Sequence, residues 1–287
     1  MLSLNAYAKI NLCLDVVGRL ENGYHQVRMI MQTVGIHDTL TFARTTGEIK
    51  ITSDAGEIPL GEDNLIYKAA SLMREKFQIA GGVSVHLEKR IPVAAGMAGG
   101  SADAACTMKA MNLLYDLGLS EEELCALGVQ IGADVPYCIM GGTALSEGIG
   151  EVLTKLPPMP ECVLLVAKPE LGVSTKEVYE RIDRHEITCH PDVDGMQKAI
   201  AESDLNGVVK RLANVLATVT EEMHPIVQRI REVMLSQGAF GSLMSGSGPS
   251  TFGIFENEEK ARAAGERIRE LGLAKRIFVT KPVSGRD

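Results

Sequence analysis

The sequence lacks the features that mark secreted or membrane-spanning chains. No apolar run approaches the roughly 18 residues needed to span a bilayer, and the opening MLSLNAYAKINLCLDVVG alternates apolar and polar residues around Lys9. This opening has neither the basic start nor the continuous apolar block of a signal peptide. The six cysteines are scattered, with no CxxC pair and no zinc-like spacing with histidine. We therefore expect buried free thiols and a protein of the reducing cytoplasm.

The sequence also has fewer basic than acidic residues. The chain has 287 residues, with 29 Lys and Arg against 37 Asp and Glu, and its formal charge is −8. A broad nucleic-acid or anionic-membrane surface needs a dense basic face, so we expect neither partner. The apolar fraction of 45% is that of an ordinary globular protein. A local basic pocket for a small phosphate-bearing ligand is compatible with this composition.

Strand and helix patterns alternate irregularly along the chain. Alternation predicts strands at 2–20, 27–52, 81–92, 162–169, 250–255 and 276–282, and strand with turn at 141–157. Helical spacing predicts helices at 65–77, 101–118, 120–132 and 258–271, and several within 175–237. Asn22-Gly23 is a hairpin signal, and Asp63 or Asn64 could cap the first helix. The irregular order favours an α+β fold over a doubly wound parallel sheet.

The best candidate for a domain boundary is rich in proline. The run LPPMPE at 156–161 holds three prolines between two patterned regions. We therefore expect two domains, comprising residues 1–156 and 157–287. Nothing in the sequence indicates an oligomeric state.

Two loops consist mostly of glycine, alanine and serine, whose side chains are small or absent. The first, in PVAAGMAGGSADAA at 92–105, lies between a strand pattern and a helix pattern, where backbone N–H groups and the helix dipole can hold phosphate. It is neither a Walker A loop nor GxGxxG, and taken alone it fits a tight turn as well as a phosphate cradle. The second, MSGSGPS at 244–250, precedes a strand. Together the two loops favour one anionic ligand between them, across a cleft.

Isolated polar residues remain ambiguous by themselves. Lys9 stands inside an alternating strand, where it is either a solvated outward-facing side chain or a functional one. Asp134, in IGADVPY, suits a turn cap as well as an active site. Tyr24-His25 follows the hairpin glycine, and a lone histidine is more often structural than catalytic.

These residues together resemble the GHMP kinases, the family of galactokinase and the homoserine, mevalonate and phosphomevalonate kinases. PVAAGMAGGSADAA resembles the family's phosphate-binding motif, and GSGPSTFGIF resembles its C-terminal glycine-rich motif. AYAKINLCLDVVGRLENGYHQV and IGADVPYCIMGGTALSEGIGE are similar to one branch, whose alcohol substrate carries a diphosphocytidyl group. The likeness runs from Ala6 to about Phe255 and is weakest in 175–237.

The resemblance implies a fold and the cofactors. It implies an N-terminal domain like the second domain of ribosomal protein S5 and a ferredoxin-like C-terminal domain. ATP and a small-molecule substrate would meet between them, and Mg²⁺ would accompany ATP. No metal ligand is assigned, because phosphates and water can hold most of the ion's coordination sphere.

The resemblance also implies roles for individual residues. Lys9 and Asp134 match the catalytic pair, with Asp134 as general base for a substrate hydroxyl and Lys9 stabilising negative charge. The implied ATP-side residues are Asn64, Pro92, Ala94, Ala95, Gly96, Ala98, Gly99, Gly100 and Ser101. The implied substrate-side residues are Asn11, Tyr24, His25, Tyr179, Gly246, Ser247 and Gly248. Among these, Tyr24 and His25 match residues that hold cytosine, and Tyr179 matches a second stacking aromatic.

The chain departs from the family pattern at three small residues. The family often has glycine where Ala94 and Ala98 stand, and serine where Ala102 stands. Alanine keeps the backbone approachable provided that φ is negative.

Two alternatives stay open. A GHMP kinase for mevalonate or homoserine is the nearer one, and Tyr24-His25 argues against it because those acceptors carry no base. An inactive relative that serves as a ligand sensor is the other, and it would have little reason to keep both loops with Lys9 and Asp134.

Overall fold

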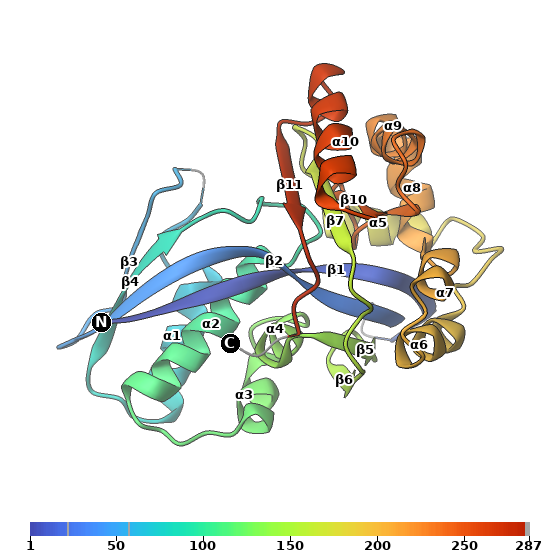
Figure 1. Ribbon diagram of the computed structural model, residues 1–287. Coiled ribbons are helices and arrows are strands. Elements are labelled where there is room, and N and C mark those ends of the chain that lie inside the picture. The colour runs from blue at the N-terminus through green and yellow to red at the C-terminus, as the bar shows by residue number, and fades with distance from the viewer. Residues whose placement is uncertain (22, 57, 285–287) are drawn as a thin grey trace. The chain divides into compact units, whose positions relative to one another are not determined.

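The structure, a computed structural model, describes residues 1–21, 23–56 and 58–284 and divides into two compact units (Figure 1). Unit 1 comprises Met1–Ala8, Ile36–Ile91 and Ala98–Met140, and unit 2 comprises Lys9–Gly35, Pro92–Met97 and Gly141–Asp287. Strands β1 (Leu2–Arg19) and β2 (His25–Thr45) contribute residues to both units. The domain boundary expected after residue 156 stays a prediction.

The described residues of unit 1 combine part of a sheet with four helices. Its remaining elements are β3 (Lys50–Ser53), α1 (Leu65–Lys76), β4 (Gly82–Glu88), α2 (Gly99–Leu114), α3 (Glu121–Gly128) and α4 (Val135–Met140). Within this unit β4 pairs antiparallel with β2 and parallel with β3. Helix α1 packs along α2, and α4 packs against both α2 and α3 (Figure 1).

Local sequence explains how these elements begin and end. Asn64 caps α1 by accepting a hydrogen bond from the N–H of Ile66 at 2.8 Å, and Ser120 forms a capping box with Glu123 at the start of α3. The single strand expected at 27–52 is wrong, because β2 ends at Thr45. The Thr45 hydroxyl donates to the carbonyl of Glu48 at 2.8 Å and closes a turn before β3.

The connection between β1 and β2 is short. The N–H of Leu20 donates to the carbonyl of Tyr24 at 2.8 Å, and Gly23 has a φ of 86°. This positive φ suits glycine and agrees with the turn expected there. Asn22, the other half of the predicted hairpin signal, lies outside the described residues.

Unit 2 contains the other part of the first sheet and a second sheet of four strands. Its remaining strands are β5 (Thr143–Glu147), β6 (Val152–Lys155), β7 (Val163–Lys168), β8 (Ala213–Asn214), β9 (Gly241–Met244), β10 (Thr251–Phe255) and β11 (Arg276–Thr280). Its helices are α5 (Thr175–Ile182), α6 (Val193–Ala201), α7 (Leu205–Lys210), α8 (Val215–Met223), α9 (Pro225–Ser236) and α10 (Glu258–Glu270). Strand β5 pairs antiparallel with β2 and β6, and β8 pairs parallel with β1.

The second sheet has its own core. Its strand order is β11-β7-β10-β9, with antiparallel pairing throughout, and α9 and α10 pack on it (Figure 1). Leu165 of β7 and Ile268 of α10 are fully buried in this core. A β-carbon on Gly265 would lie 3.2 Å from Leu165 Cδ1, so glycine lets α10 approach the sheet closely. Burial of these apolar side chains is the main favourable term holding α10 in place.

The mixture of antiparallel and parallel pairing confirms the expected α+β class. Short elements escaped the sequence patterns: α4, β8 and β9 were not predicted, because two to six residues carry too little periodicity. Within the described residues, no helix combines the length and apolar character that crossing a membrane requires.

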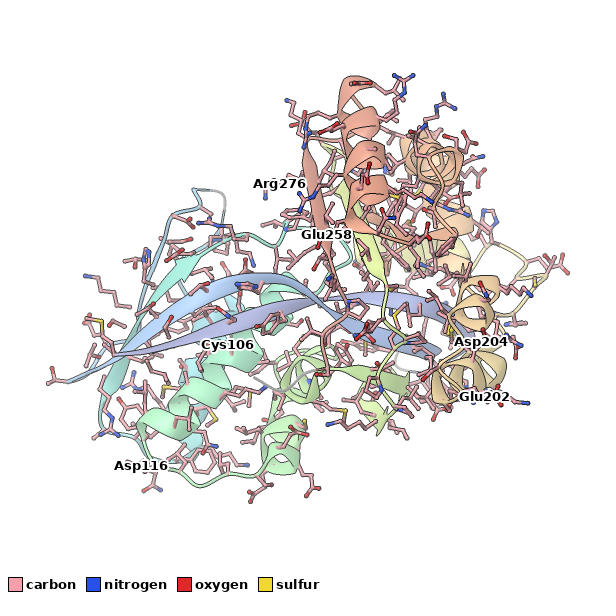
Figure 2. The ribbon with its side chains drawn as sticks, in the orientation of Figure 1. Cys106, Asp116, Glu202, Asp204, Glu258 and Arg276 are labelled. Atoms are coloured by element: carbon pink, nitrogen blue, oxygen red, sulfur yellow. The ribbon has the colours of Figure 1, made fainter. Side chains whose placement is uncertain are left out.

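The expectation of buried thiols is confirmed for Cys106 and also holds for Cys13, but Cys125 and Cys138, whose apolar neighbours in sequence predicted burial, are only partly buried, and Cys189 is exposed. Cys106 lies on α2 (Figure 2), where burial raises the pKa of its thiol to about 12. A thiol so far from ionisation is a poor nucleophile.

Candidate functional site

The two glycine-rich loops contact each other within unit 2. The hydroxyl of Ser245 donates to the carbonyl of Gly96 at 2.9 Å, and the N–H of Ser250 donates to the carbonyl of Ala95 at 3.3 Å. A β-carbon on Gly96 would lie 2.2 Å from the carbonyl oxygen of Ser245, so no larger residue fits. The loops therefore touch directly at these residues, where the sequence suggested a cleft between them.

Side chains from the segment 214–220 bind the backbone of the second loop, and the sequence did not indicate this role. Asn214 Nδ2 donates to the carbonyls of Met244 and Gly246 at 2.9 and 2.8 Å, and its Oδ1 caps α8. The Thr220 hydroxyl donates to the carbonyl of Ser247 at 3.1 Å. A capping asparagine before α8 was readable from the sequence, but its bonds to a loop 30 residues away were not.

The start of α2 has an unusual backbone. Ala98 is the N-cap of α2 with φ 56° and ψ 31°, and Ala94 has a φ of 50°. Both alanines therefore lie in the left-handed region, and the condition of negative φ stated above is not met. Glycine at these two positions, as the family often has, would adopt this backbone without a β-carbon penalty. The surrounding contacts must hold the strained residues in place.

The first turn of α2 leaves backbone N–H groups without partners inside the helix, as every helix start does. Ala98 supplies no side-chain cap for Gly99, Gly100 and Ser101. The β-carbon of a residue at position 99 would lie 3.0 Å from Ile91 Cγ2 and 3.1 Å from Lys89 Nζ. A side chain at position 99 would press on these neighbours, so glycine there also suits close packing.

A buried ion cluster lies beside this turn in unit 1. Lys89 Nζ donates to Asp103 Oδ2 at 2.8 Å and to Asp38 Oδ2. Asp38 Oδ1 accepts from the backbone N–H groups of Arg90 and Ile91 at 2.5 and 2.7 Å. The cluster thereby ties β2, the segment after β4 and the first turns of α2 together, and it fixes where α2 begins.

Two carboxylates share one ammonium in this cluster, and Asp103 Oδ1 is buried without a hydrogen-bond partner. Burial raises the pKa of Asp103 to about 8, with the Lys89 charge opposing this effect and the Asp38 charge adding to it. Burial alone would lower the pKa of Lys89, but the charges of Asp103 and Asp38 raise it above its ordinary value. The only sequence signal for this cluster is Asp103, a charged residue among the alanines of SADAA at 101–105, and its pattern alone did not predict an ion cluster.

Lys9 and Asn11 lie on the same face of β1 in unit 2. Lys9 is only 5% exposed, so the alternative of a solvated side chain is wrong. Its Nζ donates to Asn11 Oδ1 at 2.8 Å, and its N–H donates to the carbonyl of Met97 at 3.2 Å. Lys9 is thus anchored beside the first glycine-rich loop. Asn11 is fully buried and donates to Met29 Sδ at 3.2 Å.

Asp134 lies in unit 1 immediately before α4. It is partly buried, and its carbonyl accepts from the N–H of Cys138 at 3.1 Å, which is the first hydrogen bond of α4. Lys9 belongs to unit 2, and the catalytic pairing of Lys9 with Asp134 stays a prediction.

Aromatic residues gather at the start of β2. The His25 ring lies 4.8 Å from the Tyr179 ring with a 30° angle between the planes. Its Nε2 lies 2.6 Å from Asp183 Oδ1, and Asp183 also pairs with Arg19 at 3.1 Å. Tyr24 is 59% exposed. The structure thus brings His25 and Tyr179 together across more than 150 residues of sequence, and the roles of both in binding stay predictions.

The side chain of Asn64 is already engaged. Its Oδ1 caps α1, and its Nδ2 donates to the carbonyl of Pro59 at 2.7 Å. The two bonds give Asn64 a structural role at the start of α1. Its contact with adenine stays a prediction. Among the described residues, no group of three or more His, Cys, Asp or Glu side chains could hold a metal ion.

Comparison with known families gives two matches. The model of the GHMP kinase N-terminal domain matches residues 64–142, and that of the GHMP kinase C-terminal domain matches residues 188–273. Among curated proteins, the 4-diphosphocytidyl-2-C-methyl-D-erythritol kinase of Lachnospira eligens is 51% identical over 279 residues, 97% of each chain. The enzyme of the same name from Acetivibrio thermocellus is 49% identical and covers 98% of this chain and 99% of its own.

Solved structures show the same similarity. The crystal structure of a 4-(cytidine 5'-diphospho)-2C-methyl-D-erythritol kinase superimposes with a TM-score of 0.84 at 33% identity, covering 99% of this chain and 100% of the other. The crystal structure of L. major mevalonate kinase in complex with R-mevalonate has a TM-score of 0.76 at 16% identity, covering 100% of this chain and 97% of its own. The second likeness extends to the fold alone.

Glycine at position 98 should relieve backbone strain. A left-handed backbone costs a non-glycine residue about 1–2 kcal/mol, while glycine loses about 0.5–1 kcal/mol more than alanine on folding. We expect Ala98→Gly to raise the free energy of unfolding by up to about 1 kcal/mol in urea denaturation. Ala102→Gly, inside α2, is the matched control and should lower it by about 1 kcal/mol. Equal losses in both variants would contradict the assigned backbone.

Asp103 should make stability depend on pH. Its pKa rises from an ordinary 3.8 to about 8 in the folded protein, so in this window the folded state holds a proton that the unfolded chain has released. Stability therefore falls as the pH rises from 4 to 8. Asp103→Asn carries no such proton, so its free energy of unfolding should decline less between pH 6 and 8. Asp116→Asn, at a side chain 89% exposed, is the control, and parallel slopes in all three proteins would refute the assignment.

Proposed function

The chain belongs to the GHMP kinase family, and from this premise we propose that it phosphorylates 4-diphosphocytidyl-2-C-methyl-D-erythritol with ATP. The acceptor is the 2-hydroxyl, and the products are the 2-phosphate and ADP. The observation that carries this proposal is the 49–51% identity to enzymes of that name over nearly the whole length of both chains. The α+β GHMP kinase fold expected from the sequence is confirmed by the family and structural matches. The reaction belongs to the non-mevalonate route to isoprenoid precursors.

ATP would bind through backbone rather than side chains. The N–H groups of residues 96–101 would hold its phosphates at the start of α2, where the helix dipole favours negative charge. The left-handed residues Ala94 and Ala98 support this role, because strained backbone of this kind is typical of ligand-binding loops. The ion cluster of Lys89 with Asp38 and Asp103 would keep the first turn in place as phosphate binds.

The phosphoryl transfer itself needs alignment and compensation of charge more than covalent chemistry from the protein. Asp134 would accept the proton of the 2-hydroxyl as general base. Lys9 would stabilise negative charge on the reacting oxygens. Its bond to Asn11 and its burial support this role, since both restrict the ammonium to one position beside the loop at 92–97.

The cytosine end of the substrate would meet the aromatic cluster at the start of β2. Tyr24 and Tyr179 would stack on the base, and His25 would bond to its edge. The exposure of Tyr24 supports this assignment, because a ring that is 59% exposed is accessible to a base, and stacking of a base on an aromatic ring contributes about 1–3 kcal/mol. Residues Gly246, Ser247 and Gly248 of the second loop would lie along the substrate's phosphates.

Several expectations remain proposals of the same kind. Mg²⁺ would arrive with ATP and be held mainly by phosphates and water. The proposed partner is a small molecule, without nucleic acid or membrane, and the proposed location is the cytoplasm. The proposed domains are residues 1–156 and 157–287.

The function is tested by measuring ADP release with three candidate acceptors: the diphosphocytidyl substrate, mevalonate and homoserine. We expect turnover with the first only, and a new phosphomonoester signal in ³¹P spectra of the product. Turnover with mevalonate or homoserine instead would establish the rival kinase assignment. Binding of the cytidine substrate without ADP release would favour a ligand sensor.

Removing the proposed base should abolish turnover while both substrates still bind. General-base loss typically lowers the rate about 10²–10⁴-fold, so we expect a fall of this size in kcat for Asp134→Asn. Lys9→Met should also lose most activity, and the double variant should be little worse than the worse single variant, because residues acting as a unit are non-additive. Asp116→Asn is the control for loss of an exposed carboxylate. Near-normal kcat in Asp134→Asn would show that positioning alone carries the reaction.

A further inference from the structure

Asp183 links three elements of unit 2 at the end of α5. Its Oδ1 lies 2.6 Å from Nε2 of His25, the first residue of β2. Its Oδ2 lies 3.1 Å from Nη1 of Arg19, the last residue of β1. The His25 side chain is 9% exposed and stacks on Tyr179, so the imidazole is restrained at its edge and on one face.

The Asp183 carboxylate lies at the C-terminal end of α5, where a negative charge is unfavourable. Asp183 is the C-cap of α5, and its N–H donates to the carbonyl of Tyr179 at 3.4 Å. The C-terminal end of a helix dipole is negative, so an acidic residue there is unfavourable for the helix. Arg19 and the imidazole N–H compensate for it. The position of Asp183 is therefore explained by what it bonds and not by the helix that carries it.

The bond to Asp183 determines which nitrogen of His25 bears the proton. An ionised carboxylate can only accept hydrogen bonds, so Nε2 must be the N–H nitrogen. In the neutral imidazole the other nitrogen, Nδ1, then carries a lone pair and can only accept. In its neutral form with the proton on Nε2, His25 has a hydrogen-bond acceptor at Nδ1.

An acceptor at this position distinguishes the two pyrimidines. Cytosine carries an amino group at C4, which donates, whereas uracil carries a carbonyl oxygen at the same place, which accepts. An Nδ1 acceptor opposite C4 would accept a hydrogen bond from the cytosine amino group, whereas it would meet a second acceptor, the carbonyl oxygen, in uracil. The opposite tautomer would reverse this preference.

We infer that Asp183 is a specificity-determining positioning residue: it holds His25 in the Nε2–H tautomer, and His25 thereby selects cytosine over uracil. Arg19 holds the second oxygen of Asp183 and keeps the carboxylate turned toward the imidazole. This inference rests on the proposed function, because it needs a cytidine-bearing substrate at His25. Asp183 acts through His25 and need not touch the substrate.

The kinetic test compares the diphosphocytidyl substrate with its diphosphouridyl analogue. We expect Asp183→Ala to raise KM for the cytidine substrate about fivefold, the effect of one ordinary hydrogen bond, and to lower the cytidine-over-uridine preference in kcat/KM about as much. The kcat with cytidine substrate and the KM for ATP should stay within about twofold of wild type, a change of under 0.5 kcal/mol. Asp183→Glu, which keeps a carboxylate, should recover part of the preference.

Glu170→Ala is the matched control, because it removes an exposed acidic side chain from another ion pair of unit 2, with Lys275 at 2.9 Å. It should leave the preference unchanged. An unchanged preference in folded Asp183→Ala would overturn the inference, and so would an equal loss in Glu170→Ala.

A spectroscopic readout separates this inference from the proposed function. Nitrogen-15 spectra of the imidazoles distinguish N–H nitrogens from lone-pair nitrogens, and we expect His25 of the free wild-type protein to carry its proton on Nε2. A proton on Nδ1 would overturn the inference whatever the enzyme's activity. If wild type releases no ADP with the cytidine substrate, the proposed function fails, and calorimetric titration with CDP and UDP then decides the base preference directly. Equal affinities for CDP and UDP would overturn the inference in that case as well.

Discussion

The packing of Gly96 against Ser245 constrains much of unit 2. Only a residue without a β-carbon fits 2.2 Å from the Ser245 carbonyl, and the Ser245 hydroxyl then bonds the Gly96 carbonyl. This contact joins a loop from the first half of the chain to one from its last quarter. Lys9 is bonded to Met97, next to Gly96, so the position of the buried ammonium depends on the same contact. A shift of the first loop would therefore break the bond between the Lys9 N–H and the Met97 carbonyl.

Unit 1 has a comparable constraint at the beginning of α2. Lys89 binds two carboxylates from different elements, and one of them, Asp103, lies in α2 itself. Buried ion clusters of this kind add little net stability, because removing the charges from water offsets their attraction. Their geometric effect is stronger, because breaking one bond leaves a buried charge unpaired. The cluster thus specifies where the helix begins, while the left-handed Ala98 specifies the direction from which the loop enters.

The first glycine-rich loop illustrates how one residue type serves two purposes. Gly96 and Gly99 were expected to keep the backbone open to a ligand, yet both also pack closely: a β-carbon on Gly96 would lie 2.2 Å from the Ser245 carbonyl oxygen, and one on Gly99 would lie 3.0 Å from Ile91 Cγ2. Ala94 and Ala98 show the reverse case, since they keep a glycine-like backbone without being glycine. The conformation of the loop is therefore set by its packing more than by the intrinsic preference of its residues.

The α+β class, the family, a cap at Asp63 or Asn64 for the first helix, and the candidate site residues could all be predicted from the sequence. These features depend on residue types at short spacings, which can be read directly along the chain. Three features can be recognised only in the folded protein: Lys9 is buried, Ala94 and Ala98 have positive φ, and Asp183 bonds His25. Each of these depends on contacts between segments far apart in sequence. A lysine, an alanine or an aspartate looks ordinary in its own segment, and its surroundings determine its conformation and its chemistry.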